Sequence, residues 1–241
     1  LRRQRQMCIR DRTIPANTIQ VINISASLAA VENSPVNTVN NKGIYIRSNK
    51  NVSCFYSIGA ANNKEMISLK GKRARGLDFY IPVANSLTTA IVPANGYIGF
   101  DIVATGTGVT TILITPRANC IGHAKNMTFA VSLSQGQSYS VRDNNAVNPS
   151  ELGGSIVSSN KAVAVTVSGM VISTSTSCVS YYADQITNTS ELGKNYVLLR
   201  GDGNRDIAYI LSTSNGTSLQ VTTGGSTLNT VINFGETYSV N

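Results

Sequence analysis

The stretch GSIVSSNKAVAVTVSG, residues 154–169, decides the fold class. Val163, Val165 and Val167 alternate with small or polar residues, which is the period-two pattern of a half-buried β-strand. The residues Ser-Asn-Lys at 159–161 tolerate tight turn geometry. The stretch therefore predicts a β-hairpin whose turn lies at 159–161.

Three further segments share this arrangement of a short strand, a polar turn and a longer strand. They are GIYIRSNKNVSCFYS (43–57), GFDIVATGTGVTTILIT (99–115) and DIAYILSTSNGTSLQVTT (206–223). Ile46, Ile102, Val157 and Tyr209 occupy equivalent places, at spacings of 56, 55 and 52 residues. The pattern predicts four hairpins that recur about every 55 residues.

Between and after these hairpins lie other runs with strand-like patterning. They are MISL (66–69), DFYIPVA (78–84), MTFAVSL (127–133), SYSV (138–141), KNYVLLR (194–200), STLNTVINF (226–234) and TYSV (237–240). Each unit of about 55 residues thus supplies about four short antiparallel strands. We predict an all-β fold of repeated four-stranded units that is β-propeller-like. Two tandem β-sandwiches of about 110 residues each are the alternative architecture.

The composition agrees with an all-β protein of the secreted or cell-surface kind. Of 241 residues, 41% are hydrophobic and 75 are Ser, Thr or Asn, while only 13% are charged. Ordinary soluble proteins contain roughly 25% charged residues. No apolar run exceeds 7 residues, which excludes a membrane-spanning helix of about 20 residues in this sequence.

The first twelve residues, LRRQRQMCIRDR, differ from the remainder of the chain. Residues 2–12 resemble the in-frame translation of a transposase sequencing adapter, so we expect residues 1–12 to be non-native and unstructured. Their five Arg and one Asp account for half of the formal net charge of +8. Residues 13–241 are then a weakly basic fragment of one β-repeat domain, which we expect to be truncated at both ends.

Catalytic and metal-binding residues are scarce. A Cys or Ser nucleophile normally requires a His base, and the single His of the chain is His123, three residues after Cys120. We interpret His123 as a solvated loop residue. Zinc sites use about four Cys or His ligands, which Cys54, Cys120, Cys178 and His123 do not supply at suitable spacing. The sequence therefore predicts a non-enzymatic protein without metal or cofactor.

The segment Asp202–Asp206 has oxygen-bearing residues at the first, third and fifth positions of a calcium loop. However, Thr213 stands where such a loop has its bidentate Glu, and no Gly stands at its sixth position. We interpret it as a polar turn.

The leading interpretation of the sequence is a non-enzymatic binding protein. The alternative is a glycan-cleaving β-propeller enzyme that uses a pair of carboxylates.

The segment LKGKRARG, residues 69–76, is the one local concentration of charge in the native part. Lys70, Lys72, Arg73 and Arg75 are the candidate ligand-binding residues, for sulfated or sialylated glycans or for an acidic protein surface. The other interpretation is a solvated connection that discourages pairing at a sheet edge. Nucleic acid is not expected, because no aromatic residues are interleaved with the charges.

Several motifs, in a matching order, resemble the N-terminal domain of IgG-Fc-binding proteins. They are the two SNK turns, IVATGTGVTTILITP (102–116), LSQGQSYSV (133–141), and ADQITNTSELGKNYVLL (183–199) preceded by Cys178. The resemblance spans residues 43–241. It implies a secreted or surface-exposed binding and adhesion module, in a bacterial or metagenomic member of the family, with an extracellular protein or mucin-type glycan as partner.

The sequence also departs from that family. Leu192 stands where the family has Trp, and Asn51 and Ala162 stand where it has Pro. The Cys that the family carries shortly before Cys178 is absent from residues 168–177. The local disulfide that the resemblance would imply therefore lacks one partner.

Overall fold

The computed structural model describes residues 13–24, 28–60, 63–83, 97–144, 152–172, 180–199, 201 and 207–240. The chain divides into two units, Leu1–Glu32 and Asn33–Asn241. The first unit contains the short helix α1 (Leu28–Val31). The adapter-like residues 1–12 lie outside the described residues. None of the described helices is long and apolar enough to span a membrane.

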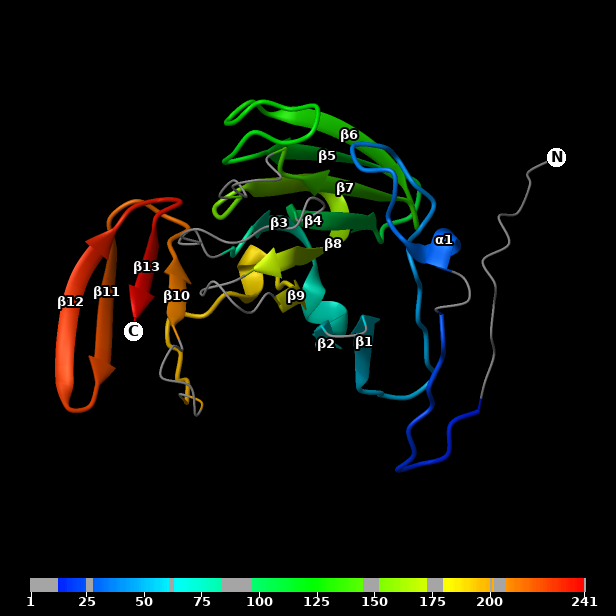
Figure 1. Ribbon diagram of the computed structural model, residues 1–241, viewed down its shortest axis with the longest axis horizontal. Coiled ribbons are helices and arrows are strands. Elements are labelled where there is room, and N and C mark those ends of the chain that lie inside the picture. The colour runs from blue at the N-terminus through cyan, green and yellow to red at the C-terminus, as the bar shows by residue number, and fades with distance from the viewer. Residues whose placement is uncertain are drawn as a thin grey trace. The chain divides into compact units, whose positions relative to one another are not determined.

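The second unit is built from β-strands, which confirms the predicted all-β class (Figure 1). Its main sheet has seven strands and is strongly curved. These strands are β3 (Arg75–Tyr80), β4 (Tyr97–Ala104), β5 (Val109–Thr115), β6 (Phe129–Ser134), β7 (Ser138–Arg142), β8 (Ile156–Ile172) and β9 (Ser180–Gln185). All pairings in this sheet are antiparallel.

Strand β8 is the centre of the sheet because both of its edges are paired. One edge binds β5 and then β4, and the other binds β3 and then β9. For example, Val167 is paired with Phe100 on one edge and with Asp184 on the other. The strand therefore fixes the register of four others.

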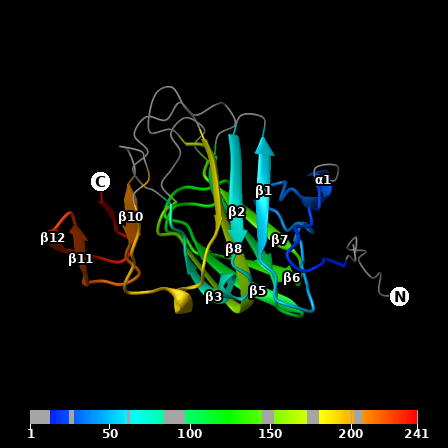
Figure 2. The ribbon, with the colours of Figure 1, turned by 90° about the horizontal axis from the view of Figure 1, so that it is seen from below.

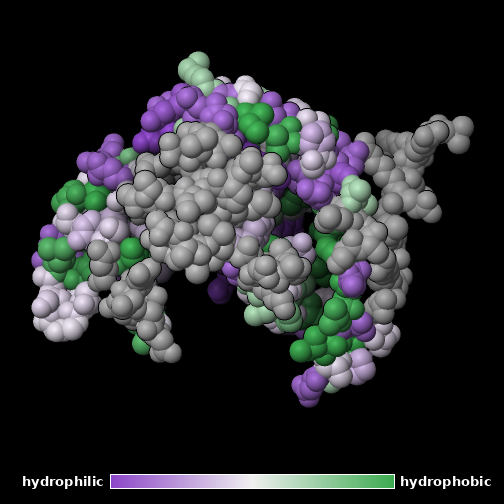
Figure 3. Space-filling view, viewed as in Figure 1, coloured by the Kyte–Doolittle hydropathy of each residue, from purple (hydrophilic) through white to green (hydrophobic). Residues whose placement is uncertain are grey.

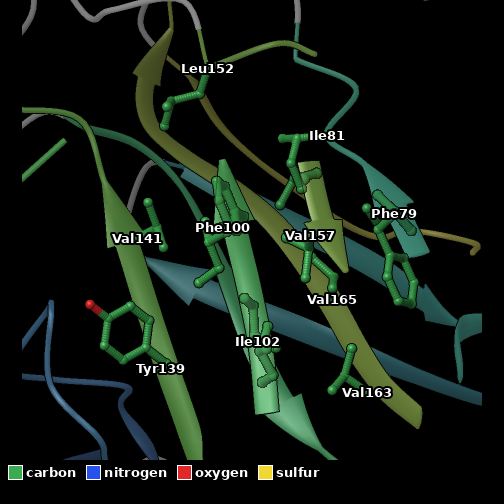
Figure 4. Close-up of a cluster of buried hydrophobic side chains, with 14 of the residues drawn as sticks. Phe79, Ile81, Phe100, Ile102, Tyr139, Val141, Leu152, Val157, Val163 and Val165 are labelled. Carbon is green, nitrogen blue, oxygen red and sulfur yellow. The ribbon is translucent and has the colours of Figure 1, made fainter. Parts of the chain in front are cut away.

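The core lies on the face of the sheet to which the alternating apolar residues point. Figure 4 shows Phe100 and Ile102 of β4 in one buried cluster with Val157 and Val165 of β8. Phe79, Ile81, Ile98, Phe100, Ile102, Ile112, Ile114, Leu133, Leu152, Val157, Val163 and Val165 are all fully buried. Val163, Val165 and Val167 of β8 are thus inside, as the period-two pattern predicts.

Three smaller two-stranded ladders complete the described structure. They are β1 (Cys54–Ala60) with β2 (Asn63–Leu69), β10 (Ala208–Leu211) with β13 (Thr237–Val240), and β11 (Thr217–Thr223) with β12 (Ser226–Ile232). Strand β2 lies against β9 (Figure 2). Leu228 and Val231 of β12 are exposed, and Figure 3 shows hydrophobic side chains at the surface of these C-terminal strands.

The hairpin predicted at 154–169 is wrong, because β8 runs through it as one strand of 17 residues. No turn separates the buried residues Val157 and Val163, although Lys161 between them is exposed and the pairing with β3 shifts register here, between Gly76 and Asp78. The polar side chains of Ser159 and Asn160 instead form hydrogen bonds with neighbouring segments of the same chain. Asn160 Oδ1 accepts from the Thr111 amide at 2.9 Å, and Ser159 Oγ lies 3.0 Å from the Leu77 carbonyl oxygen.

The other predicted hairpins are also paired differently. Strands β4 and β5, predicted to pair with each other within 99–115, both pair with β8. Within 43–57 only β1 is a strand, and it pairs with β2. Within 206–223, β10 pairs with β13, and β11 pairs with β12 across Gly224 and Gly225, whose positive φ angles suit a two-residue hairpin turn.

The repeated four-stranded units, the β-propeller-like arrangement and the tandem sandwiches are consequently not confirmed. The seven-stranded sheet takes strands from segments that the repeat assigns to different units, and joins them along β8. Of the intervening runs, MISL, DFYIPVA (through Tyr80), MTFAVSL, SYSV, STLNTVINF and TYSV contain strand residues, as predicted. The run KNYVLLR does not form a strand in its described part, residues 194–199.

Replacing Phe100 by Ala should lower the free energy of unfolding by about 3–5 kcal/mol, because a fully buried aromatic side chain is removed beside β8. Urea denaturation measures this change. Leu113→Ala on β5 is the matched control, since Leu113 is exposed on the same sheet, and it should change stability by less than about 1 kcal/mol. Equal losses for the two variants would contradict the assigned core.

Candidate functional site

The basic segment 69–76 forms the turn between β2 and β3. Residues Gly71–Ala74 form a short 3₁₀ helix, η2, and Gly71 has a φ of +57° at its start. Ala74 is buried, whereas Lys72, Arg73 and Arg75 are exposed. The buried alanine therefore anchors a turn whose three cationic side chains extend into solvent.

Lys70 differs from the other three cations because it is engaged by β9. Its Nζ lies 2.5 Å from Asp184 Oδ1 and also donates to the Gln185 carbonyl oxygen. The Lys70 amide donates to Gln185 Oε1 at 2.8 Å. Among the described residues this is the one ion pair. Lys70 consequently has a structural contact, and it does not line the groove described next.

Asn188 holds the basic turn against a second 3₁₀ helix, η3 (Thr189–Glu191). Its buried side-chain amide donates to the carbonyl oxygens of Arg73 and Arg75, at 3.2 and 3.0 Å. Its Oδ1 accepts from the Ser190 amide at 3.0 Å, which caps η3. A Cβ on Gly76 would lie only 2.3 Å from Asn188 Cβ, so this close approach requires glycine at position 76.

The two 3₁₀ helices enclose a surface groove of about 670 Å³. Its lining includes three cations, two carboxylates, two hydroxyls and one exposed aliphatic side chain: Lys72, Arg73, Arg75, Asp78, Glu191, Thr189, Ser190 and Leu77. Arg75 Nε donates to Thr105 Oγ1 at 3.2 Å, and Asp78 Oδ1 accepts from Ser158 at 2.6 Å. The guanidinium and carboxylate are thus positioned by hydroxyl contacts, which leaves hydrogen-bonding capacity for a ligand.

A protein-family model described as "IgGFc binding protein" matches residues 69–241, which is more than half of the chain. This chain belongs to the IgGFc-binding family. The match begins at the first residue of the basic segment and includes every residue that lines the groove. No curated protein and no solved structure matches the chain.

In this IgGFc-binding chain, three of the four predicted site residues lie together in the groove: Lys72, Arg73 and Arg75. The opposite side of the groove, residues 188–191, was not predicted from the sequence. Asn188 and residues 189–191 come from 115 residues further along the chain. Their only sequence signal is that they lie in the run ADQITNTSELGKNYVLL, which carries the family resemblance. No local pattern indicates that this run meets the basic turn.

Cys120 does not have the environment of a nucleophile. Burial, and secondarily the nearby charge of Asp143, raise the pKa of the Cys120 thiol to about 12. A thiol with this pKa is protonated near neutral pH, and the thiolate is the reactive form. Its Sγ lies 3.5 Å from the Ala118 carbonyl oxygen. The described residues also contain no group of three His, Cys, Asp or Glu that could hold a metal, while Cys178 and residues 202–206 lie outside them.

His123 lies in the loop between β5 and β6, as the sequence suggested, but its partly exposed ring also packs against neighbouring residues. Its ring stacks on Phe129 with centroids 3.4 Å apart. Its Nε2 lies 2.8 Å from Asn37 Oδ1 and 3.2 Å from the Tyr139 hydroxyl. The Asn37 amide donates to the Ser140 carbonyl oxygen of β7. His123 therefore fastens the segment around Asn37 to the edge of the sheet.

Asn188→Ala should destabilise the protein by about 1–3 kcal/mol, because two carbonyl oxygens and one amide lose a hydrogen-bond partner in a part-buried site. Urea denaturation measures the loss. Thr189→Ala removes one exposed hydrogen bond, to Asp78, and should cost less. If the Thr189 variant lost as much stability as the Asn188 variant, Asn188 would not be the clamp between the two helices.

His123 should make stability depend on pH. Burial lowers the pKa of His123 below its usual 6.5, so the folded state favours the neutral ring. The stabilisation of the folded state by the neutral ring is fully present above about pH 6.5 and decreases as the pH falls below that value. His123→Gln removes the titration. The difference in urea midpoint between the native chain and this variant should therefore fall between pH 7.5 and pH 5. A difference that is constant with pH would contradict this assignment.

Proposed function

We propose that this chain is a non-enzymatic binding and adhesion module of a secreted or cell-surface protein, and that the groove between η2 and η3 is its contact site. The partner is an acidic protein surface or a mucin-type glycan. The observation that carries the proposal is that Lys72, Arg73 and Arg75 line one groove within the family match. Membership of a binding-protein family supports a binding role.

The charge arrangement of the groove supports an anionic partner. Lys72, Arg73 and Arg75 have no carboxylate within ion-pair distance among the described residues, whereas Lys70 is neutralised by Asp184. Guanidinium groups bind carboxylates and sulfates through paired hydrogen bonds. Asp78 and Glu191, on the same lining, would accept hydrogen bonds from hydroxyl or amide groups of the partner. Such a mixed groove provides specificity as well as attraction.

Replacing Lys72, Arg73 and Arg75 together by Ser should weaken binding to immobilised sulfated mucin or immobilised Fc about tenfold, or about 1.4 kcal/mol. Exposed charge contacts contribute on the order of 0–1 kcal/mol each, so three account for this loss. Binding of the native chain should also weaken with salt, because the Debye length falls from about 10 Å at 0.1 M to about 3 Å at 1 M. Surface plasmon resonance measures both effects.

The matched control replaces Arg47, Lys50 and Lys125 by Ser. These residues are exposed, carry the same total charge and do not line the groove. Affinity close to that of the native chain is expected for this control. Equal weakening of both triple variants would mean that net charge, and not the groove, attracts the partner. Hydrolysis of mucin glycans by the purified chain would overturn the non-enzymatic assignment in favour of a carboxylate-dependent enzyme.

A further inference from the structure

A second surface feature follows η3, in the segment Asn195–Leu199. The sequence pattern predicts a strand here, yet these residues belong to no ladder among the described strands. Four large side chains in a row are exposed: Tyr196 at 72%, Val197 at 97%, Leu198 at 66% and Leu199 at 95%. Folded domains seldom expose contiguous apolar residues on this scale without a binding role.

The backbone amide and carbonyl groups of this segment, like its side chains, are available for contacts with a partner. Within the described part of the chain, no amide or carbonyl group of residues 195–199 has a hydrogen-bond partner. The one polar contact in the segment is that of the Tyr196 hydroxyl, which accepts from the Gly193 amide at 2.8 Å. The segment therefore offers unpaired backbone groups and apolar side chains at the same place.

These two properties together identify the kind of occupant. A flat apolar surface would cover side chains but would leave the amide and carbonyl groups of the segment without partners. An added β-strand pairs the backbone and packs alternate side chains at the same time. The residues Tyr, Val and Leu also favour a strand when a partner edge is present. The occupant is thus an extended polypeptide.

The basic residues that flank the segment in the sequence disfavour a second copy of this chain as its occupant. The apolar residues lie between Lys194 and Arg200, and no acidic residue occurs from 192 to 201. Antiparallel pairing of two copies centred on Val197 would place Lys194 opposite Arg200, and like charges opposite each other are destabilising. The exposed residues Ile44–Ile46 have the same flanks, Lys42 and Arg47, so they are not a suitable partner either.

We propose that an extended segment of a different protein, apolar at its centre and carrying carboxylates at both ends, adds as a β-strand along Asn195–Leu199. The apolar centre covers Tyr196 to Leu199, and the carboxylates complement the two basic residues that flank this stretch in the sequence, Lys194 and Arg200. This surface is separate from the groove, since Lys194 does not line it. The two sites are therefore tested with different residues.

The probe is a phage-displayed library of random 12-residue peptides selected on the full chain at 50 mM salt. Enriched peptides should have alternating apolar centres with Asp or Glu at both ends. Their synthetic versions should bind at least tenfold more weakly after Val197→Pro, which removes one amide donor. Val197→Thr, which keeps the amide and the strand preference, is the matched control and should bind within about twofold of the native chain.

Because Val197 is almost completely exposed, both variants should retain the native melting temperature. Methylation of alternate backbone nitrogens of the peptide is a second test that leaves the protein unchanged, and it should abolish binding. Equal binding to the Pro and Thr variants, or enrichment without acidic ends, would overturn the proposal. So would a dimer by light scattering that Val197→Pro dissociates, because the occupant would then be a second copy.

Discussion

The pairing of β8 along both of its edges is the constraint on which the rest of the structure depends. Ile156 is bound to Thr115 of β5 and to Tyr80 of β3, and eleven residues later Val167 is bound between β4 and β9. Since Val157, Val163, Val165 and Val167 of β8 are buried, a slip of one residue would turn all four away from the core. The hydrophobic pattern of one strand therefore determines the register of four others, and those four carry the remaining strands and the turns.

The groove is a consequence of this arrangement. Strands β3 and β9 occupy the same edge of β8, with β3 paired to residues 156–164 and β9 to residues 166–172. The turn that precedes β3 and the turn that follows β9 are brought together by that shared edge. Lys70 and Asn188 then fix the junction, one through Asp184 and the other through the carbonyl oxygens of Arg73 and Arg75. The remaining cations are left facing η3. The geometry of the site therefore follows from the pairing of β3 and β9 with one edge of β8, which brings together two turns more than 100 residues apart in the chain.

The extent to which sequence predicts this protein differs between local and non-local features. Alternation predicted most strands because burial on one face requires it. It did not predict their partners, since the same alternation suits a hairpin or a single long strand, as the uninterrupted passage of β8 through Ser159–Lys161 shows. Gly224 and Gly225 form a turn whose chemistry is local and readable. The basic segment could be recognised from the sequence because its charges are adjacent there. The different role of Lys70 could not be predicted, because its carboxylate partner, Asp184, lies 114 residues away.

Besides lining the groove, basic residues flank two exposed stretches that belong to no described ladder. The strand-like stretches Ile44–Ile46 and Tyr196–Leu199 are both exposed, and both lie between two basic residues. By contrast, no charged residue occurs from Val163 to Ile172 in β8, where both edges are paired. Basic ends make pairing of the two exposed stretches with each other, or of one copy with another, electrostatically unfavourable. At Tyr196–Leu199 they still permit pairing with the acidic-ended segment that we propose. In the function that we propose, the sparse charges of this chain have two roles: in the groove they attract a partner directly, and beside the exposed stretches they disfavour the wrong one.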